Sequence, residues 1–161
     1  MEYARRAVEK KSYALMEMLL THGWDINTQL GPDEPAAITM AFDDRRMIEW
    51  FLSHGADPNA ECEFGLTPLS VAVEVAPFDI VQLLVDHGGS VKRGTPLHDA
   101  AASGNDPAVR YLLDQGANPL IRDTRGSLPS EVARNTQHET TAQLLESATS
   151  AATSAVTTNS T

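Results

Sequence analysis

The sequence has one cysteine, Cys62, and no apolar run that approaches the ~20 residues of a membrane-spanning helix. A single thiol excludes an internal disulfide. Near the start, Glu2, Glu9 and Glu17 interrupt the apolar residues, and the small-residue cleavage site of a secretory signal does not follow. These absences favour a cytoplasmic or nuclear protein that does not associate with membranes.

Basic side chains are also few: 12 lysines and arginines stand against 22 aspartates and glutamates, and the net charge is −10. A protein that binds a phosphate backbone needs a basic face, so we do not expect a nucleic-acid partner. We expect the acidic side chains to form a solvated surface. The chain has 161 residues, 42% of them hydrophobic, which is enough for one domain with a core.

Motifs for enzymatic chemistry are missing as well: the sequence has no G-x-x-x-x-G-K-[ST], G-x-S-x-G or H-E-x-x-H. Cys62 has no C-x-x-C partner, which predicts a free thiol rather than a nucleophile. His22, His54 and His87 could suggest a metal site. However, equivalent positions on helical layers about 8–10 Å apart cannot share an ion whose bonds to nitrogen are about 2.0–2.1 Å. We expect these histidines at helix ends, and we predict no enzyme, cofactor or metal.

What the sequence does contain is a repeated helix opening, GLTPLSVAVEV at 65–75 and GTPLHDAAASG at 94–104. Prolines at positions 35, 68, 96 and 129 are separated by 33, 28 and 33 residues, and a glycine follows each of the first three after 20 residues. Counting 20 back from Gly23 places a further start at Tyr3. Each block therefore predicts a short helix, a turn, a second helix and a closing glycine in the left-handed conformation.

The openings of the first helices predict how each helix starts. Thr67 and Thr95 place a hydroxyl cap before a proline at the first helical position. His98 is expected to bond locally near Thr95. Glu34 and Leu128 stand where the threonine belongs, so the helices that follow them should lack a hydroxyl cap.

A period of about 33 residues with the pattern T-P-L-H-x-A resembles the ankyrin repeat. The resemblance covers residues 2 to about 147 and is carried best by TPLSVAVEVAPFDIVQLLVDHGGSV (67–91) and TPLHDAAASGNDPAVRYLLDQGANP (95–119). It implies an all-α solenoid of five stacked helix pairs linked by β-turn fingers. Polar outer faces on the first and last pairs predict capping repeats, and the uncharged Ser/Thr/Ala-rich segment 148–161 predicts a disordered tail. The expected repeats are 3–34, 35–67, 68–95, 96–128 and 129–147, with helix pairs at 3–21, 35–53, 68–86, 96–114 and 129–147.

Ankyrin-repeat proteins usually contact their targets with the finger tips and the exposed, concave side of the first helices. The expected fingers are finger one (22–34), finger two (54–67), finger three (88–95) and finger four (116–128). The first two each carry a net charge of −3, and the last two carry +2 and +1. Finger three is five residues shorter than its neighbours and should be blunt. Phe64 and Leu66 could instead cover the core between repeats. The candidate contact residues are Leu30, Phe42, Glu61, Glu63, Phe64, Leu66, Lys92, Arg93, Arg122 and Arg125.

The resemblance implies a non-enzymatic adaptor or regulator that binds a protein partner and is itself a monomer. Two alternatives stay open. The first is a small inhibitor or transcription co-regulator that acts by occluding its target. The second is a structural module or a piece of a larger protein. The fold does not choose among them, because the same array serves many partners.

Overall fold

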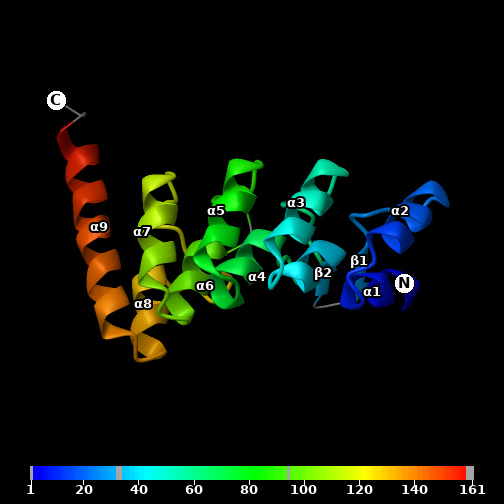
Figure 1. Cartoon of the computed structure of the whole chain (residues 1–161). Helices are drawn as coiled ribbons and strands as arrows, with labels where there is room; N and C mark the ends of the chain where they lie inside the picture. Colours follow the sequence, from blue (N-terminus) through cyan, green and yellow to red (C-terminus); the bar gives the residue numbers. More distant parts are fainter. Residues whose placement is uncertain (1, 32–33, 94, 159–161) are drawn as a thin grey trace. The chain divides into compact units, whose positions relative to one another are not determined.

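The computed structural model describes residues 2–31, 34–93 and 95–158, and within these ranges almost all regular structure is helical (Figure 1). The chain forms two compact units, Met1–Ser90 (unit 1) and Val91–Thr161 (unit 2). The elements are α1 (Glu2–Glu9), α2 (Tyr13–Thr21), β1 (Gln29–Gly31), β2 (Glu34–Ala36), the 3-10 helix η1 (Ala37–Ala41), α3 (Arg45–Ser53), α4 (Pro68–Val75), α5 (Phe78–Asp86), α6 (Pro96–Ala102), α7 (Asp106–Asp114), α8 (Pro129–Asn135) and α9 (Glu139–Thr158).

Unit 1 is built from the pairs α1–α2, η1–α3 and α4–α5, and its first helices pack in series, α1 on η1 and η1 on α4. In Figure 1, α3 and α5 project to the same side of η1 and α4. The first helices are slim where they meet, because they bury alanines. The second helices supply the bulky side chains of the core, and in α3 and α5 these follow the i, i+3, i+4 spacing of an amphipathic helix. The largest of these fully buried residues are Met16, Met47, Ile48, Phe51, Ile80 and Leu84.

Unit 2 contains the pairs α6–α7 and α8–α9, with α6 packed on α8 and α7 packed on α9. Leu97 of α6, Val109 and Leu112 of α7 and Leu145 of α9 form the apolar interior of this unit. Thr141 is buried with them, and its hydroxyl donates a short hydrogen bond to the Asp106 carboxylate. This bond joins the start of α7 to the start of α9.

The two threonine–proline openings behave differently. Thr67 caps α4 as predicted: its hydroxyl accepts the Ser70 N–H at 3.1 Å, and the Ser70 hydroxyl accepts the Thr67 N–H at 2.8 Å. The corresponding prediction for Thr95 is wrong. Its hydroxyl donates instead to the Asp99 carboxylate, at 3.0 Å, and does not cap α6. The backbone differs as well: the capping Thr67 is extended with ψ 161°, whereas Thr95 has ψ 36° and does not adopt the extended conformation typical of an N-cap.

The two openings without threonine also differ from each other. The predicted helix start at Pro35 is wrong in detail. Residues Glu34–Ala36 pair as strand β2 with β1, and only the short η1 follows. At the other opening, Leu128 does lack a hydroxyl cap as predicted, but its N–H donates to the Glu131 carboxylate at 2.7 Å. The carboxylate thus satisfies one of the backbone donors that a helix start leaves unpaired.

Two asparagines, each four residues after a closing glycine, join neighbouring repeats in unit 1. The Asn27 side chain donates to the Gly55 carbonyl at 3.1 Å and accepts the Asp57 N–H at 2.7 Å. Asn59 repeats this pattern with the Gly88 carbonyl at 2.9 Å and the Ser90 N–H at 2.7 Å. Each amide side chain therefore clamps two backbone groups about 30 residues ahead.

We expect Asn59→Ala to lower the free energy of unfolding by about 1–3 kcal/mol, because two backbone groups lose their side-chain partner. Urea denaturation followed by circular dichroism measures the change. Asn118→Ala is the matched control, since Asn118 accepts only the local Leu120 N–H. Equal losses in the two variants would contradict the clamp.

The segment predicted to be a disordered tail is helical in the described residues, because α9 continues to Thr158. The physical reason lies in its alanines, which favour helix, and the hydroxyls of the segment find acceptors within the same helix. Ser147, Thr149, Ser150 and Thr153 each donate to the carbonyl four residues earlier, at 2.7–3.0 Å. The prediction of disorder from residue 148 is corrected to this extent, and residues 159–161 lie outside the described part of the chain.

Candidate functional site

Finger two presents an aromatic side chain at its tip. Its turn is closed by the Cys62 N–H, which donates to the Leu66 carbonyl at 3.0 Å, and by the Gly65 N–H, which donates to the Cys62 carbonyl at 2.9 Å. Cys62 is a free thiol, as predicted, and it is buried beneath the turn. Phe64 stands between these anchors with 69% of its surface exposed. The alternative that Phe64 covers the core is therefore wrong.

The other candidate residues of unit 1 are placed less uniformly. Glu61 and Glu63 are exposed on the same finger as Phe64, whereas Leu66 is half-buried at its base. Leu30 is half-buried in β1. Phe42, at 7% exposure, is not an exposed aromatic, because it packs at the end of η1.

Beside Phe42 lies a shallow pocket of about 370 Å³ between the ends of η1 and α4. Val75, the last residue of α4, lines it and is exposed. The sequence does not single out Val75, because a valine at the end of an apolar helix also fits the core. Thr39, Met40, Asp43 and Pro77 complete the lining.

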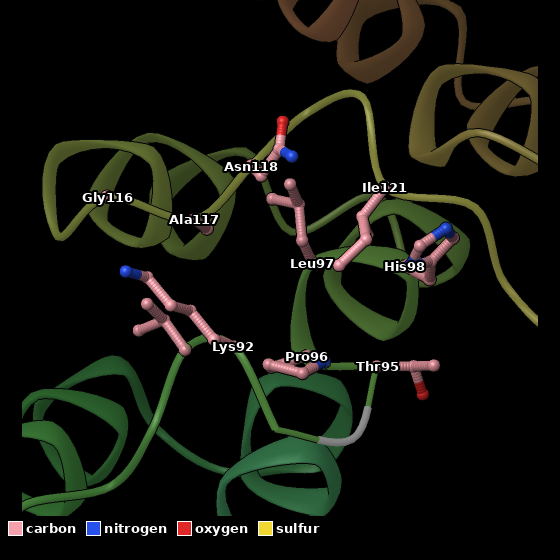
Figure 2. A pocket seen from close by; sticks show the side chains of 10 residues that line it. Lys92, Thr95, Pro96, Leu97, His98, Gly116, Ala117, Asn118 and Ile121 are labelled. Atoms are coloured by element: carbon pink, nitrogen blue, oxygen red, sulfur yellow. The ribbon is translucent and has the colours of Figure 1, made fainter.

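Unit 2 has a pocket of about 350 Å³ at the base of finger four, between the opening of α6 and residues 91–92 (Figure 2). Leu97 and Ile121 supply apolar wall, Asn118 lies beside them, and Lys92 extends from the segment that precedes α6. Ile121 is 48% exposed and its neighbour Leu120 is 37% exposed, but only Ile121 lines the pocket. Sequence reasoning missed both residues, because it read finger four by charge alone.

The predicted basic residues of unit 2 lie on the segments that form this pocket. Lys92, Arg93, Arg122 and Arg125 are all exposed. Arg122 donates to the Gly126 carbonyl at 2.6 Å and lies 3.5 Å from the Glu131 carboxylate.

The single acidic residue of finger four is held inside its turn. The Asp123 carboxylate accepts the Ser127 N–H at 2.8 Å and the Arg125 N–H at 2.9 Å. The Ser127 N–H, followed by that of Arg125, lowers the pKa of Asp123 below its usual value. His98 was expected to bond near Thr95, and this is wrong: its Nε2 pairs with the Ser127 carbonyl at 3.1 Å. The ring is buried and reaches across to finger four, so it supports the same turn.

The three recurrent histidines lie at helix ends, as predicted. In His22, His54 and His87, Nδ1 lies 2.7–2.8 Å from the carbonyl four residues earlier in its own helix. Each residue is the C-terminal cap of that helix. Within the described ranges, no group of three or more His, Cys, Asp or Glu side chains is placed to hold a metal ion. Among the described helices, none is long and apolar enough to span a membrane.

Comparison with known protein families decides the assignment. A model of ankyrin repeats (3 copies) matches residues 5–93 and 36–123. The chain belongs to the ankyrin-repeat family. The predicted fold class is thereby confirmed, while our division of the chain into five repeats stays a prediction.

Individual ankyrin-repeat relatives differ greatly in size. Cyclin-dependent kinase 4 inhibitor B of Rattus norvegicus is 30% identical over 125 residues, which cover 74% of this chain and 95% of that protein. A transient receptor potential cation channel subfamily A member 1 homolog of Caenorhabditis elegans is 29% identical over 147 residues, 86% of this chain and 12% of that protein. A putative E3 ubiquitin-protein ligase, XBAT35, of Arabidopsis thaliana is 40% identical over 78 residues, 44% of this chain and 17% of that protein. The chain thus spans only a small part of the latter two.

Ankyrin repeats are protein-interaction modules, and this chain is one of them. The family is typically non-enzymatic. An ankyrin array offers fingers and first helices as contact surface, and in this chain the described fingers carry exposed apolar residues, Phe64 on finger two and Ile121 on finger four.

Proposed function

We propose that this ankyrin-repeat module is a non-enzymatic adaptor or regulator, a monomer in the cytoplasm or nucleus, and that it binds its partner through its finger tips. The observation that carries the proposal is Phe64. An aromatic side chain that is 69% exposed at the tip of a turn, with Glu61 and Glu63 beside it, has the composition of a binding hot spot and its polar rim.

The candidate residues that are exposed supply the rest of the proposed surface. The acidic side chains of finger two and the basic side chains at 92, 93, 122 and 125 steer an oppositely charged partner and fix its register. Affinity comes from the apolar anchor, because exposed charge pairs contribute little in water. We propose no nucleic-acid or membrane partner, since the chain is strongly acidic.

Phe64→Ala should weaken binding of the partner by about tenfold to a hundredfold, which corresponds to about 1–3 kcal/mol. The partner is first captured from cells with a photo-crosslinking residue placed at position 64. Its affinity for the variants is then measured by surface plasmon resonance.

Tyr3→Ala is the matched control, because Tyr3 is an aromatic residue of α1 with 68% exposure outside the fingers. If Tyr3→Ala weakened binding as much as Phe64→Ala, the finger-tip site would be wrong. Circular dichroism of both variants separates loss of binding from loss of folding.

A second candidate function is a small inhibitor that occludes its target. The relative named as an inhibitor of cyclin-dependent kinase 4 favours it, since the match covers 95% of that relative's length. The test is direct: the purified chain is added to cyclin-dependent kinase 4 with its cyclin, and kinase activity is measured over a range of concentrations. Unchanged activity at concentrations that saturate the authentic inhibitor would exclude this kinase as the target.

The remaining alternative is a structural module or a piece of a larger protein. It is favoured by relatives that are much longer than the segment that this chain matches. Crosslinking at position 64 addresses it too. A structural module would yield no protein crosslinked at position 64.

A further inference from the structure

The pocket of unit 2 has the dimensions of a receptor for one side chain. Its volume of about 350 Å³ lies at the small end of the range for ligand pockets. Leu97 and Pro96 form a buried apolar floor, while Ile121 stands at the mouth, half exposed. Burying an aliphatic side chain here would remove both its own surface and that of Ile121 from water.

The two segments that form the pocket are basic, in contrast to the rest of the chain, and one of their cations, Lys92, lines the pocket itself. The segments 91–95 and 116–128 carry four of the six cationic side chains of unit 2, namely Lys92, Arg93, Arg122 and Arg125. Their one acidic residue, Asp123, is held by backbone N–H groups of its own turn. On α6, the Asp99 carboxylate accepts the hydroxyl of Thr95. By comparison, unit 1 carries 15 acidic and 6 basic side chains.

We infer that this pocket binds an acidic linear segment of the partner protein, with one aliphatic side chain inserted against Leu97 and Ile121. Carboxylates that flank the aliphatic side chain would pair with Lys92 at the pocket and with Arg93 and Arg125 on the same two segments. The inference rests on the proposed function as a protein-binding module and names the chemistry of a second contact. Arginine and lysine pair with carboxylates through charge-assisted hydrogen bonds, and the apolar insertion fixes the register that charge alone leaves open.

A nucleic acid fits this site less well than an acidic peptide. Single strands are held by aromatic side chains on which the bases stack. The described residues that line the pocket offer no aromatic ring besides the imidazole of His98, and that ring is bonded to the Ser127 carbonyl. The walls are aliphatic, which suits leucine, isoleucine or methionine.

The probe is a fluorescein-labelled peptide with one central leucine between runs of aspartate and glutamate. Its binding to the full chain is followed by fluorescence anisotropy at two salt concentrations. We expect saturable binding that weakens when the leucine is replaced by glycine or when the acidic residues are replaced by their amides. A single-stranded oligonucleotide of equal charge should compete poorly.

Two variants of the protein locate the site. Ile121→Asp should weaken binding of the peptide at least about tenfold, and Lys92→Glu combined with Arg125→Glu should remove most of the salt dependence. Leu120→Asp is the matched control for Ile121, because Leu120 is its exposed neighbour and does not line the pocket. Arg110→Glu, on α7, is the charge control.

Three results would each overturn the inference: no saturable binding of the leucine peptide, equal loss in Leu120→Asp and Ile121→Asp, or equal competition by the oligonucleotide. The first would leave the proposed function untouched, since capture of a partner through Phe64 is measured separately and on unit 1. Thermal melting of each variant confirms that the fold persists.

Discussion

Phe51→Ala should lower the free energy of unfolding by about 3–5 kcal/mol, which would make it the most damaging single truncation that we predict. Phe51 of α3 is completely buried, and its ring packs edge-on to that of Trp50 with centroids 5.4 Å apart. Removing the ring loses its transfer free energy and leaves a cavity that a packed helical layer fills only in part.

The chain offers a control of the same residue type in the same unit. Phe64→Ala should change the free energy of unfolding by no more than about 0.5 kcal/mol, because the ring is 69% exposed. Guanidinium denaturation of both variants, followed by circular dichroism, gives the comparison. A large loss in Phe64→Ala would contradict both its exposure and its assignment as a contact residue, whereas a small loss in Phe51→Ala would contradict the core.

Gly104→Ala should destabilise the protein by about 2–4 kcal/mol, for two separate reasons. Gly104 has φ +67°, a left-handed conformation that disfavours a side chain. In addition, a β-carbon at this position would lie 2.4 Å from Nδ1 of His138, so the imidazole would have to move. The backbone N–H of His138 donates to the Ala133 carbonyl between α8 and α9, so the main chain of His138 is fixed and only its side chain can move aside.

Two further variants separate these causes. Gly126→Ala carries only the conformational cost, because Gly126 has φ +81° and open space where its β-carbon would lie. The free energy of unfolding of Gly126→Ala should therefore fall by about 1–2 kcal/mol. In the double variant Gly104→Ala, His138→Ala the clash with the imidazole is absent. After the loss in His138→Ala alone is subtracted, its loss in free energy of unfolding should be close to that of Gly126→Ala. Equal losses in Gly104→Ala and Gly126→Ala would show that the His138 imidazole moves aside without lowering the free energy of unfolding.

The helices and the pairing of first and second helices could be predicted from the sequence, because spacing alone identifies them. Apolar residues at i, i+3, i+4 define the buried faces of α3, α5 and α7, and the closing glycines adopt the left-handed conformation that the repeat requires. Thr67 could be predicted as a cap because no carboxylate lies where its hydroxyl could reach ahead.

Other features depend on competition between neighbours, which spacing does not reveal. Thr95 donates to Asp99 and is not extended as a capping residue is, so it does not cap α6. The helix after Pro35 is short because residues 34–36 pair with β1. Phe64 could not be assigned to tip or core, because an aromatic residue before a glycine fits both. The pocket of unit 2 could not be foreseen, since its lining comes from two segments, 91–98 and 116–121, that are 18 residues apart.

The asparagine clamps of unit 1 have a consequence for how such an array can change over time. The side chains of Asn27 and Asn59 bond to backbone atoms of the following repeat, to carbonyls at 55 and 88 and to N–H groups at 57 and 90. The following repeat therefore contributes only backbone atoms to these hydrogen bonds. Any residue other than proline at 57 and 90 preserves the N–H groups that they need. These hydrogen bonds therefore place no demand on the side chains at 57 and 90, so these two positions at the fingers can diversify toward new partners without loss of the bonds.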